Sequence, residues 1–227
     1  MDKVGEVTLE IMKRAGWYNK WLFSTFAKDL GGRILEVGGG IGNFTRLLKI
    51  KGEVWSFDIN KGYINKLKKI IGDKAGFGDI ENGKYFFGEK TFTNIICLNV
   101  LEHIKNDKKA LENMNNLLAK DGKLVLLVPA HQPFRGSLDE ALGHFRRYSK
   151  KGLSKKLALA GFRIYNLRYL NFSGGIGWFI NSKVLGRKIL SEKQLVFFDK
   201  MARPLLSLEK IIEPPFGLSI LAVASKK

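Results

Sequence analysis

The strongest constraint on the fold of this chain is the segment R-I-L-E-V-G-G-G-I-G-N-F-T at residues 33–45. Ile34, Leu35 and Val37 form a short apolar run typical of a buried strand, and the glycines follow directly. Glycine is needed where the backbone turns sharply or where a ligand presses against the main chain. The segment therefore predicts a buried strand, a tight turn beside a ligand, and the start of a helix.

The spacing of the glycines separates two classes of ligand. A dinucleotide site has the pattern G-x-G-x-x-G, whose third glycine would fall at Asn43. The pattern here is E-x-G-x-G-x-G, and an acid at Glu36 would repel a pyrophosphate but suits a cationic ligand with an amino group. This pattern resembles motif I of the class I S-adenosylmethionine-dependent methyltransferases; a glycine-rich turn without a ligand is the alternative. The resemblance implies that S-adenosyl-L-methionine, and its product S-adenosyl-L-homocysteine, bind at Glu36, Gly38, Gly39, Gly40 and Gly42.

Further positions match the cofactor motifs of that family. Asp58 lies near the end of the apolar segment Glu53–Ile59, where an acid of a doubly wound fold reaches ribose hydroxyls. A surface acid at a strand end is the alternative. The resemblance also implies that Asp79 accepts from the adenine amino group while Ile80 packs on the ring, although an aspartate there also suits a turn. Ile59, Asn99 and Val100 would border the cofactor.

The order of the elements and the resemblance predict an α/β fold. We expect a doubly wound, seven-stranded, mostly parallel sheet with helices on both faces and an antiparallel last strand. The expected strands lie at residues 33–37, 53–59, 76–80, 93–100, 123–129, 162–170 and 216–224. The chain is expected to form one domain, 1–227, with a helical lid at 1–30, a cofactor-binding core at 31–170, a helical insertion at 171–213 and the last strand at 214–227. Trp17, Tyr18 and Trp21 are candidates for covering the cofactor.

The long polar connection Ala130–Tyr148 follows the fifth expected strand, at the edge where open α/β sheets bind ligands. It contains His131 and His144, and histidine suits a general base because its pKa lies near neutrality. Either histidine would take the proton of a hydroxyl acceptor, with Asp139 to orient it. Each would equally serve to stabilise the loop, and we predict no metal ligands in the chain.

Two more runs resemble elements of small-molecule methyltransferases, namely L-E-H-I at 101–104 and G-H-F-R-R-Y at 143–148. Glu102 and His103 are expected to orient their loop rather than to react. The signatures of enzymes that methylate adenine or glutamine amino groups, cytosine C5 or arginine are missing. N-V-L-E follows the fourth strand, and Cys97 lies within that strand. The expected acceptor is therefore a small-molecule or lipid-linked compound, most often methylated on oxygen.

The charge of the chain is unusual, with 39 basic and 21 acidic residues and a net charge of +18. No acidic residue occurs between Ala141 and Ser191, where eleven lysines and arginines alternate with aromatic residues such as Phe172, Trp178 and Phe179. Basic and aromatic side chains together suit peripheral contact with an anionic membrane. They also suit RNA, which we expect less than a membrane as the partner. A basic surface exposed to solvent, with no binding function, is the third interpretation.

The remaining composition restricts the location of the protein. The amino terminus lacks the pattern of a signal peptide, and no apolar run is long enough to span a membrane. One cysteine excludes a disulfide framework within the chain. We expect a cytoplasmic protein, with peripheral membrane contact allowed. Besides a hydroxyl methyltransferase, the sequence leaves open an RNA or nucleoprotein methyltransferase and a non-catalytic cofactor-binding subunit.

Overall fold

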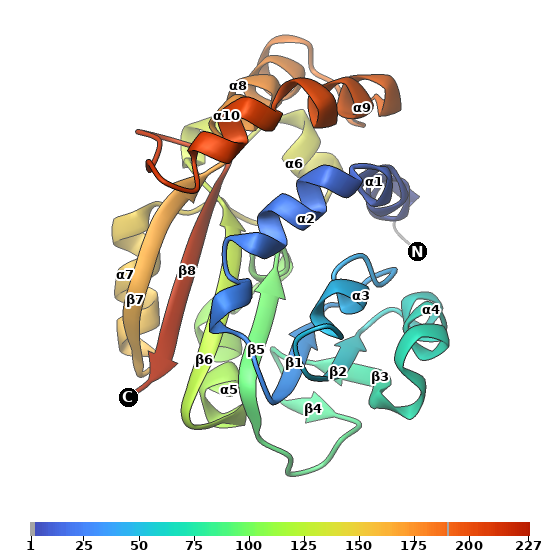
Figure 1. The fold of residues 1–227 in the computed structure, drawn as a ribbon, viewed down its shortest axis with the longest axis vertical. Helices are drawn as coiled ribbons and strands as arrows, with labels where there is room; N and C mark the ends of the chain where they lie inside the picture. Colours follow the sequence, from blue (N-terminus) through green and yellow to red (C-terminus); the bar gives the residue numbers. More distant parts are fainter. Residues whose placement is uncertain (1–2, 190) are drawn as a thin grey trace.

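A mixed eight-stranded β-sheet forms the centre of the computed structural model, which describes residues 3–189 and 191–227 (Figure 1). Its strands are β1 (Arg33–Val37), β2 (Glu53–Asp58), β3 (Ala75–Asp79), β4 (Lys84–Tyr85), β5 (Phe92–Leu98), β6 (Leu118–Pro129), β7 (Phe162–Leu170) and β8 (Ser219–Lys226). Their order in the sheet is β4-β3-β2-β1-β5-β6-β8-β7. The neighbours from β3 to β6 are parallel, whereas β8 runs antiparallel to both β6 and β7.

The predicted fold class is confirmed, including the antiparallel last strand. The sequence predicted seven strands, and the additional strand is β4, a two-residue edge strand that pairs antiparallel with β3. The fifth expected strand begins earlier than predicted, at Leu118, because Asp121 adopts a φ of 60° inside β6 instead of ending it. The residue types of Lys120-Asp121-Gly122 are typical of a turn, so the sequence alone does not show that the strand continues through them.

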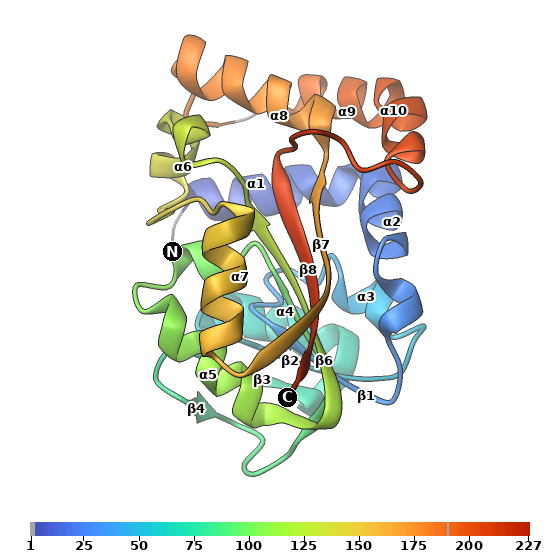
Figure 2. The ribbon, with the colours of Figure 1, turned by 90° about the vertical axis from the view of Figure 1, so that its left-hand side faces the viewer.

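The helices cover both faces of the sheet and the edge at which the parallel strands end (Figures 1 and 2). They are α1 (Lys3–Arg14), α2 (Gly16–Ser24), α3 (Thr45–Leu48), α4 (Lys61–Ile71), α5 (Asp107–Leu117), α6 (Ser137–Ala141), α7 (Lys150–Leu159), α8 (Phe172–Phe179), α9 (Glu192–Met201) and α10 (Arg203–Leu208). Short helical turns are η1 (Ala27–Asp29), η2 (Gly72–Lys74), η3 (Leu101–His103), η4 (Gln132–Phe134) and the π-helix η5 (Ile180–Val184). The helical lid expected within residues 1–30 is broken at Ala15, between α1 and α2.

Alternate residues of the central strands fill two separate cores. Leu35, Ile95 and Leu126 point to one face, where α5 and α7 pack. Ile34 and Ile96 point to the other face, where α2 and α10 contribute their apolar side chains. Because successive side chains of a strand point to opposite faces, strands covered on both sides must be apolar throughout. This explains the continuous apolar runs of β5 and β6.

The remaining helices lie together at one end of the sheet. Figures 1 and 2 show α8, α9 and α10 side by side above the end at which β5 and β6 finish. The helices α1 and α2 lie beneath them, next to the carboxyl ends of β1 and β5. Within the described residues, none of the helices combines the length and the apolar character that crossing a membrane requires.

Candidate active site

A cavity of about 600 Å³ lies at the carboxyl ends of β1, β2, β3 and β5, the edge where parallel α/β sheets bind ligands. Most of the predicted cofactor residues line it, namely Glu36, Gly38, Gly39, Gly40, Asp58, Ile59, Asp79, Ile80, Asn99 and Val100. Of the three predicted catalytic residues, only His144 lines it. Gly42 also lies outside the lining. A side chain at this position would collide with Ile70 of α4. Its absence of a side chain serves the packing of α4 against the loop.

The glycine loop forms one wall of this cavity with its backbone. Gly38 and Gly40 have φ values of 68° and 54°, which favour glycine strongly. A Cβ atom on Gly38 would lie 2.6 Å from the side chain of Val100. The helix predicted to follow the turn is α3, which starts at Thr45 and spans four residues. The bare backbone of the loop, more than a helix dipole, therefore defines the ligand surface here.

The first acid of the loop has a structural role. Oε2 of Glu36 accepts hydrogen bonds from Oγ1 of Thr45 at 2.5 Å and from Oγ of Ser56 at 2.8 Å. Burial raises the pKa of Glu36 to about 7. The carboxyl group thus ties β1 to β2 and to the start of α3, and it fixes the loop at the wall of the cavity.

Two further acids face the cavity from the next strands. Oδ2 of Asp58 accepts from the backbone N–H of Gly40 at 3.0 Å, and burial raises the pKa of this carboxyl group. Both oxygens of Asp79 accept from Asn82, at 3.0 and 2.8 Å, which is the turn role that the sequence left open. Asp58 therefore holds the loop in place, and Asp79 lines the cavity from a turn that its own side chain stabilises.

The amino-terminal helix α1 lies over the glycine loop. The side chain of Asn43 donates to the backbone carbonyl of Leu9 at 3.0 Å, and a Cβ atom on Gly40 would lie 3.1 Å from Leu9. Lys66 of α4 pairs with Glu6 and Glu10 of α1, at 3.0 and 3.3 Å. These contacts connect α1 to the core across the mouth of the cavity. Among the aromatic residues considered for the lid, Tyr18 lines the cavity, whereas Trp17 and Trp21 do not.

The opposite wall carries a buried cluster around Asp139. Nδ1 of His144 lies 2.8 Å from Oδ1 of Asp139, and Arg147 binds the same carboxylate through Nε at 2.7 Å and Nη2 at 3.2 Å. Nε1 of Trp178 donates to Oδ2 at 3.1 Å. Burial acts to raise the pKa of Asp139, but hydrogen bonds from His144 and Arg147 outweigh it and lower the pKa to about 2. An ionised Asp139 only accepts, so Nδ1 of His144 carries a hydrogen and Nε2 is the ring nitrogen turned away from Asp139.

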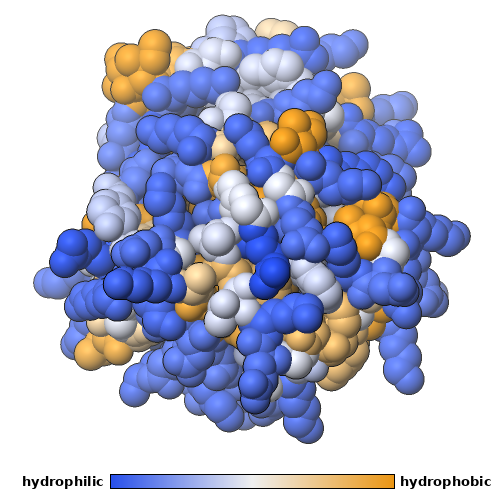
Figure 3. Space-filling model, turned by 60° about the horizontal axis from the view of Figure 1, so that its bottom comes forward, coloured by the Kyte–Doolittle hydropathy of each residue, from blue (hydrophilic) through white to orange (hydrophobic). Residues whose placement is uncertain are grey.

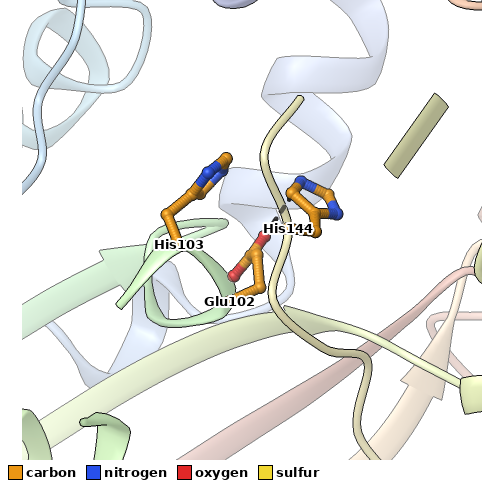
Figure 4. Close-up of side chains that lie close together, drawn as sticks. All are labelled: Glu102, His103 and His144. Atoms are coloured by element: carbon orange, nitrogen blue, oxygen red, sulfur yellow. Dashed lines mark ion pairs between the residues drawn. The ribbon is translucent and has the colours of Figure 1, made fainter. Parts of the chain in front are cut away.

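Glu102 and His103 complete this wall from η3, directly after β5 (Figure 4). Oε1 of Glu102 lies 4.0 Å from Nε2 of His144, and the ring centroids of His103 and His144 are 4.7 Å apart. Burial raises the pKa of Glu102 to about 8. The sequence assigned Glu102 and His103 to the loop alone, and the structure places both at the cavity with His144.

His131, the other predicted base, lies away from this cluster. It adopts a φ of 60°, its ring stacks on Tyr169 at a centroid distance of 4.8 Å, and it is not part of the cavity lining. Asp139 orients His144 and not His131. The ring of His131 thus lies among the aromatic side chains of Tyr169 and Phe216, away from His144.

The run G-H-F-R-R-Y at 143–148 is bound to α5 and η3 by polar contacts. Arg146 pairs with Asp107 at 3.0 Å, and the hydroxyl of Tyr148 donates to the same carboxylate at 3.0 Å. The backbone N–H of Phe145 donates to the carbonyl of Glu102 at 2.9 Å. The polar residues of the run thus hold the segment against η3. Several basic residues of the acid-free stretch are consequently engaged in ion pairs, which the sequence could not show.

Comparison with known proteins identifies the family. A family model described as a methyltransferase domain matches residues 13–167, so the chain belongs to this methyltransferase family. An uncharacterised methyltransferase of Staphylococcus carnosus is 31% identical over 111 residues, which are 47% of this chain and 51% of that protein. A polyketide synthase-like protein of Preussia isomera is 31% identical over 115 residues, which are 44% of this chain and 5% of that protein. The matches thus span about half of the length of the first of these relatives and a small part of the second.

Solved structures share the fold at low sequence identity. A methyltransferase of Thermotoga maritima, described as a possible histamine N-methyltransferase, has a TM-score of 0.66 and 18% identity, with all of both chains covered. The N-methyltransferase NodS of Bradyrhizobium japonicum, solved with S-adenosyl-L-homocysteine, has a TM-score of 0.56 and 15% identity, covering 91% of this chain and 84% of that one. The family match thus identifies the chain as a member of the methyltransferase family, and the solved structures share its fold.

Proposed function

We propose that this enzyme transfers a methyl group to a hydroxyl oxygen of a small-molecule or lipid-linked acceptor. The observation that supports the proposal is the position of His144, whose Nε2 lies on the cavity wall while Asp139 holds Nδ1 at 2.8 Å. A histidine oriented in this way by a carboxylate is the usual arrangement for moving a proton near neutral pH. A hydroxyl acceptor needs such a group, because it must lose its proton when its oxygen is methylated.

The cavity fits the cofactor on the side of the glycine loop. S-adenosylmethionine supplies a methyl group that its sulfonium sulfur has already activated. The backbone of Gly38–Gly40 leaves the wall open, since side chains at these positions would collide with their neighbours or narrow the space below α1. Asp58 would accept from the ribose hydroxyls, and Asp79 with Ile80 would hold the adenine ring.

The other wall would then take the acceptor. The acceptor oxygen bonds to the methyl carbon as the carbon–sulfur bond breaks, and the hydroxyl proton passes to the cluster around His144. The enzyme's contribution is to align the oxygen with the methyl group and to exclude water. Trp178 and Leu142 supply the apolar part of that wall. An apolar wall beside a polar cluster suits an acceptor that carries a hydroxyl on an apolar body.

The helical layer above the cavity supports a lipid-linked acceptor. Many large apolar side chains of α8 to α10 and the segments around them are exposed: Ile176, Phe179, Ile180, Val184, Leu185, Val196, Phe197, Met201, Leu205, Leu208, Ile211 and Ile212. Lysines and arginines of residues 183–210 lie among them in the sequence. The far side of the molecule is mainly hydrophilic, with scattered apolar residues (Figure 3). Apolar side chains flanked by cations suit the surface of an anionic membrane.

RNA is the second candidate acceptor. The ion pairs of several basic residues reduce the support for it. RNA binding would rest on the free positive charges of the acid-free stretch. Arg146, Arg147 and Lys156 of that stretch are paired with Asp107 or Asp139, and Lys150 is paired with Glu213. Exposed apolar residues add nothing to phosphate binding, so the surface of α8 to α10 favours a lipid over RNA.

The test compares two histidine variants in a methyl-transfer assay. The enzyme would be incubated with tritium-labelled S-adenosylmethionine and a panel of hydroxylated lipids, small alcohols, amines and RNA. We expect labelling of a hydroxylated compound, and His144→Ala should lower its turnover by about 100-fold without changing the affinity for S-adenosylhomocysteine. His131→Ala is the control and should stay near the wild-type rate. Labelling confined to amines or RNA would overturn the proposal, as would equal rates for both variants.

A further inference from the structure

Three potential ligand groups meet on the cavity wall opposite the glycine loop. One oxygen or nitrogen atom from each of Glu102, His103 and His144 lies within 4.8 Å of the other two. Glu102 and His103 come from η3, and His144 comes from the segment after α6 (Figure 4). All three line the cavity, so a small ligand held between them would be reached from the acceptor side.

The carboxyl group of Glu102 faces this cluster from a buried position. Its side chain is completely buried, and neither carboxylate oxygen has a hydrogen-bond partner among the described residues. Nε2 of His144, 4.0 Å from Oε1, is too far for a hydrogen bond. Buried carboxylates in folded proteins are normally paired, hydrogen-bonded or bound to a metal ion. Among the described residues neither oxygen of Glu102 accepts a hydrogen bond, and the ion pair that it makes is the long one to His144 at 4.0 Å (Figure 4).

His144 is oriented as metal-binding histidines are. Its Nδ1 lies 2.8 Å from Oδ1 of Asp139, and Nε2 is therefore the ring nitrogen that faces Glu102. Asp139 is held in turn by Arg147 and Trp178. A carboxylate on the far nitrogen fixes the tautomer and the ring plane of a ligand histidine and makes it a better donor to a metal.

We propose that Glu102, His103 and His144 bind one divalent transition-metal ion on the acceptor side of the cavity. Two imidazoles and one carboxylate suit zinc, manganese or ferrous iron, whereas magnesium and calcium prefer oxygen ligands alone. Three protein ligands leave positions open to the cavity. At bond lengths of about 2.1 Å, the ligand atoms would have to approach one another by roughly 1 Å, and the exposed His103 side chain has room to turn.

This inference rests on the proposed function for the role of the ion. The ion would lower the pKa of an acceptor hydroxyl in an open position, so that its proton leaves to solvent as the acceptor binds, before water is excluded and in place of the transfer to the cluster around His144. The ion would also hold the oxygen in line with the methyl group. His144 would then act as a metal ligand, and its pairing with Asp139 would serve the metal instead of a proton transfer. The sequence predicted no metal ligands, because the three residues come from two motifs that are 40 positions apart.

The test measures metal binding without any acceptor. The full-length protein would be stripped with a chelator and titrated with Mn²⁺, followed by electron paramagnetic resonance, and with Zn²⁺ in a calorimeter. We expect one equivalent bound. Glu102→Gln, which keeps the volume of the side chain, and His103→Ala, at an exposed position, should each weaken the affinity at least tenfold. Asp139→Asn should weaken it about 10- to 100-fold.

Two matched controls make the result decisive. His131→Ala removes a histidine outside the cavity, and Glu140→Gln removes a charge beside Asp139; both should bind the ion like the wild type. Absence of stoichiometric binding, or equal affinities for Glu102→Gln and Glu140→Gln, would overturn the metal site. Binding with no labelled hydroxyl acceptor would instead overturn the proposed function and leave the metal site standing.

Discussion

Removal of the Asp139 carboxylate should destabilise the protein strongly, because it leaves a buried cation without its partner. The side chains of Asp139 and Arg147 are both fully buried, and two nitrogens of the guanidinium bind the two carboxylate oxygens. In Asp139→Ala, the Arg147 guanidinium keeps, among the described residues, a hydrogen bond to the carbonyl of Ala130 at 3.0 Å and its position over the Trp178 ring, but no anionic hydrogen-bond partner. The loss of one partner of a buried ion pair costs about 3 to 5 kcal/mol.

The measurement is urea unfolding followed by circular dichroism. With a slope of about 2 kcal/mol per molar urea, a loss of this size lowers the midpoint by about 2 M. The adjacent Glu140 supplies a matched control, since its side chain is 65% exposed and its one ion pair, with Arg135, is 3.5 Å long. Glu140→Ala should change the free energy of unfolding by no more than about 0.5 kcal/mol.

A double variant separates the lost partner from other causes. Arg147→Met removes the cation but keeps an apolar side chain of similar length. Asp139→Ala combined with Arg147→Met should cost clearly less than the sum of the two single changes, because no unpaired guanidinium stays buried. The reasoning is refuted if Asp139→Ala unfolds at the same urea concentration as Glu140→Ala, or if the two single costs simply add.

Two more predictions concern the cofactor loop and the helical layer. Gly40→Val should abolish binding of S-adenosylhomocysteine in calorimetry, because φ is 54° and Leu9 lies 3.1 Å from a Cβ atom there. Gly88→Val, with a φ of 65° and open surroundings, should bind normally, and full binding by both would contradict the site. Phe197→Ser, at a side chain 66% exposed on α9, should reduce sedimentation with anionic liposomes, whereas Ile50→Ser, at one 75% exposed beyond α3, should not. Equal binding to neutral liposomes would exclude the anionic surface.

The sequence by itself determined the sheet and the glycine-loop half of the cavity. The apolar runs, the glycine spacing and Asp58 at a strand end depend on patterns a few residues long. Such patterns follow directly from the alternation of a strand and the backbone freedom of glycine, so they can be read without knowing what packs against them. The parallel order then brings Gly38–Gly40, Asp58 and Asp79 to one edge of the sheet.

Only the tertiary structure decided the acceptor half. The sequence offered His131 and His144 as equal candidates, with Asp139 to orient either one, and the fold pairs Asp139 with His144 while Tyr169 stacks on His131. Trp178 was considered for membrane contact from its neighbours in the sequence, but it donates to Asp139 across 39 positions of chain.

The physical reason lies in the range of the interactions. The orientation of His144 and the isolation of Glu102 depend on segments that approach only after the sheet and its helices have packed. A buried charge must find its partner wherever the fold provides one, and the distance along the chain does not restrict that choice. Local patterns therefore place the strands and turns, and the packed fold selects which polar side chains share the cavity.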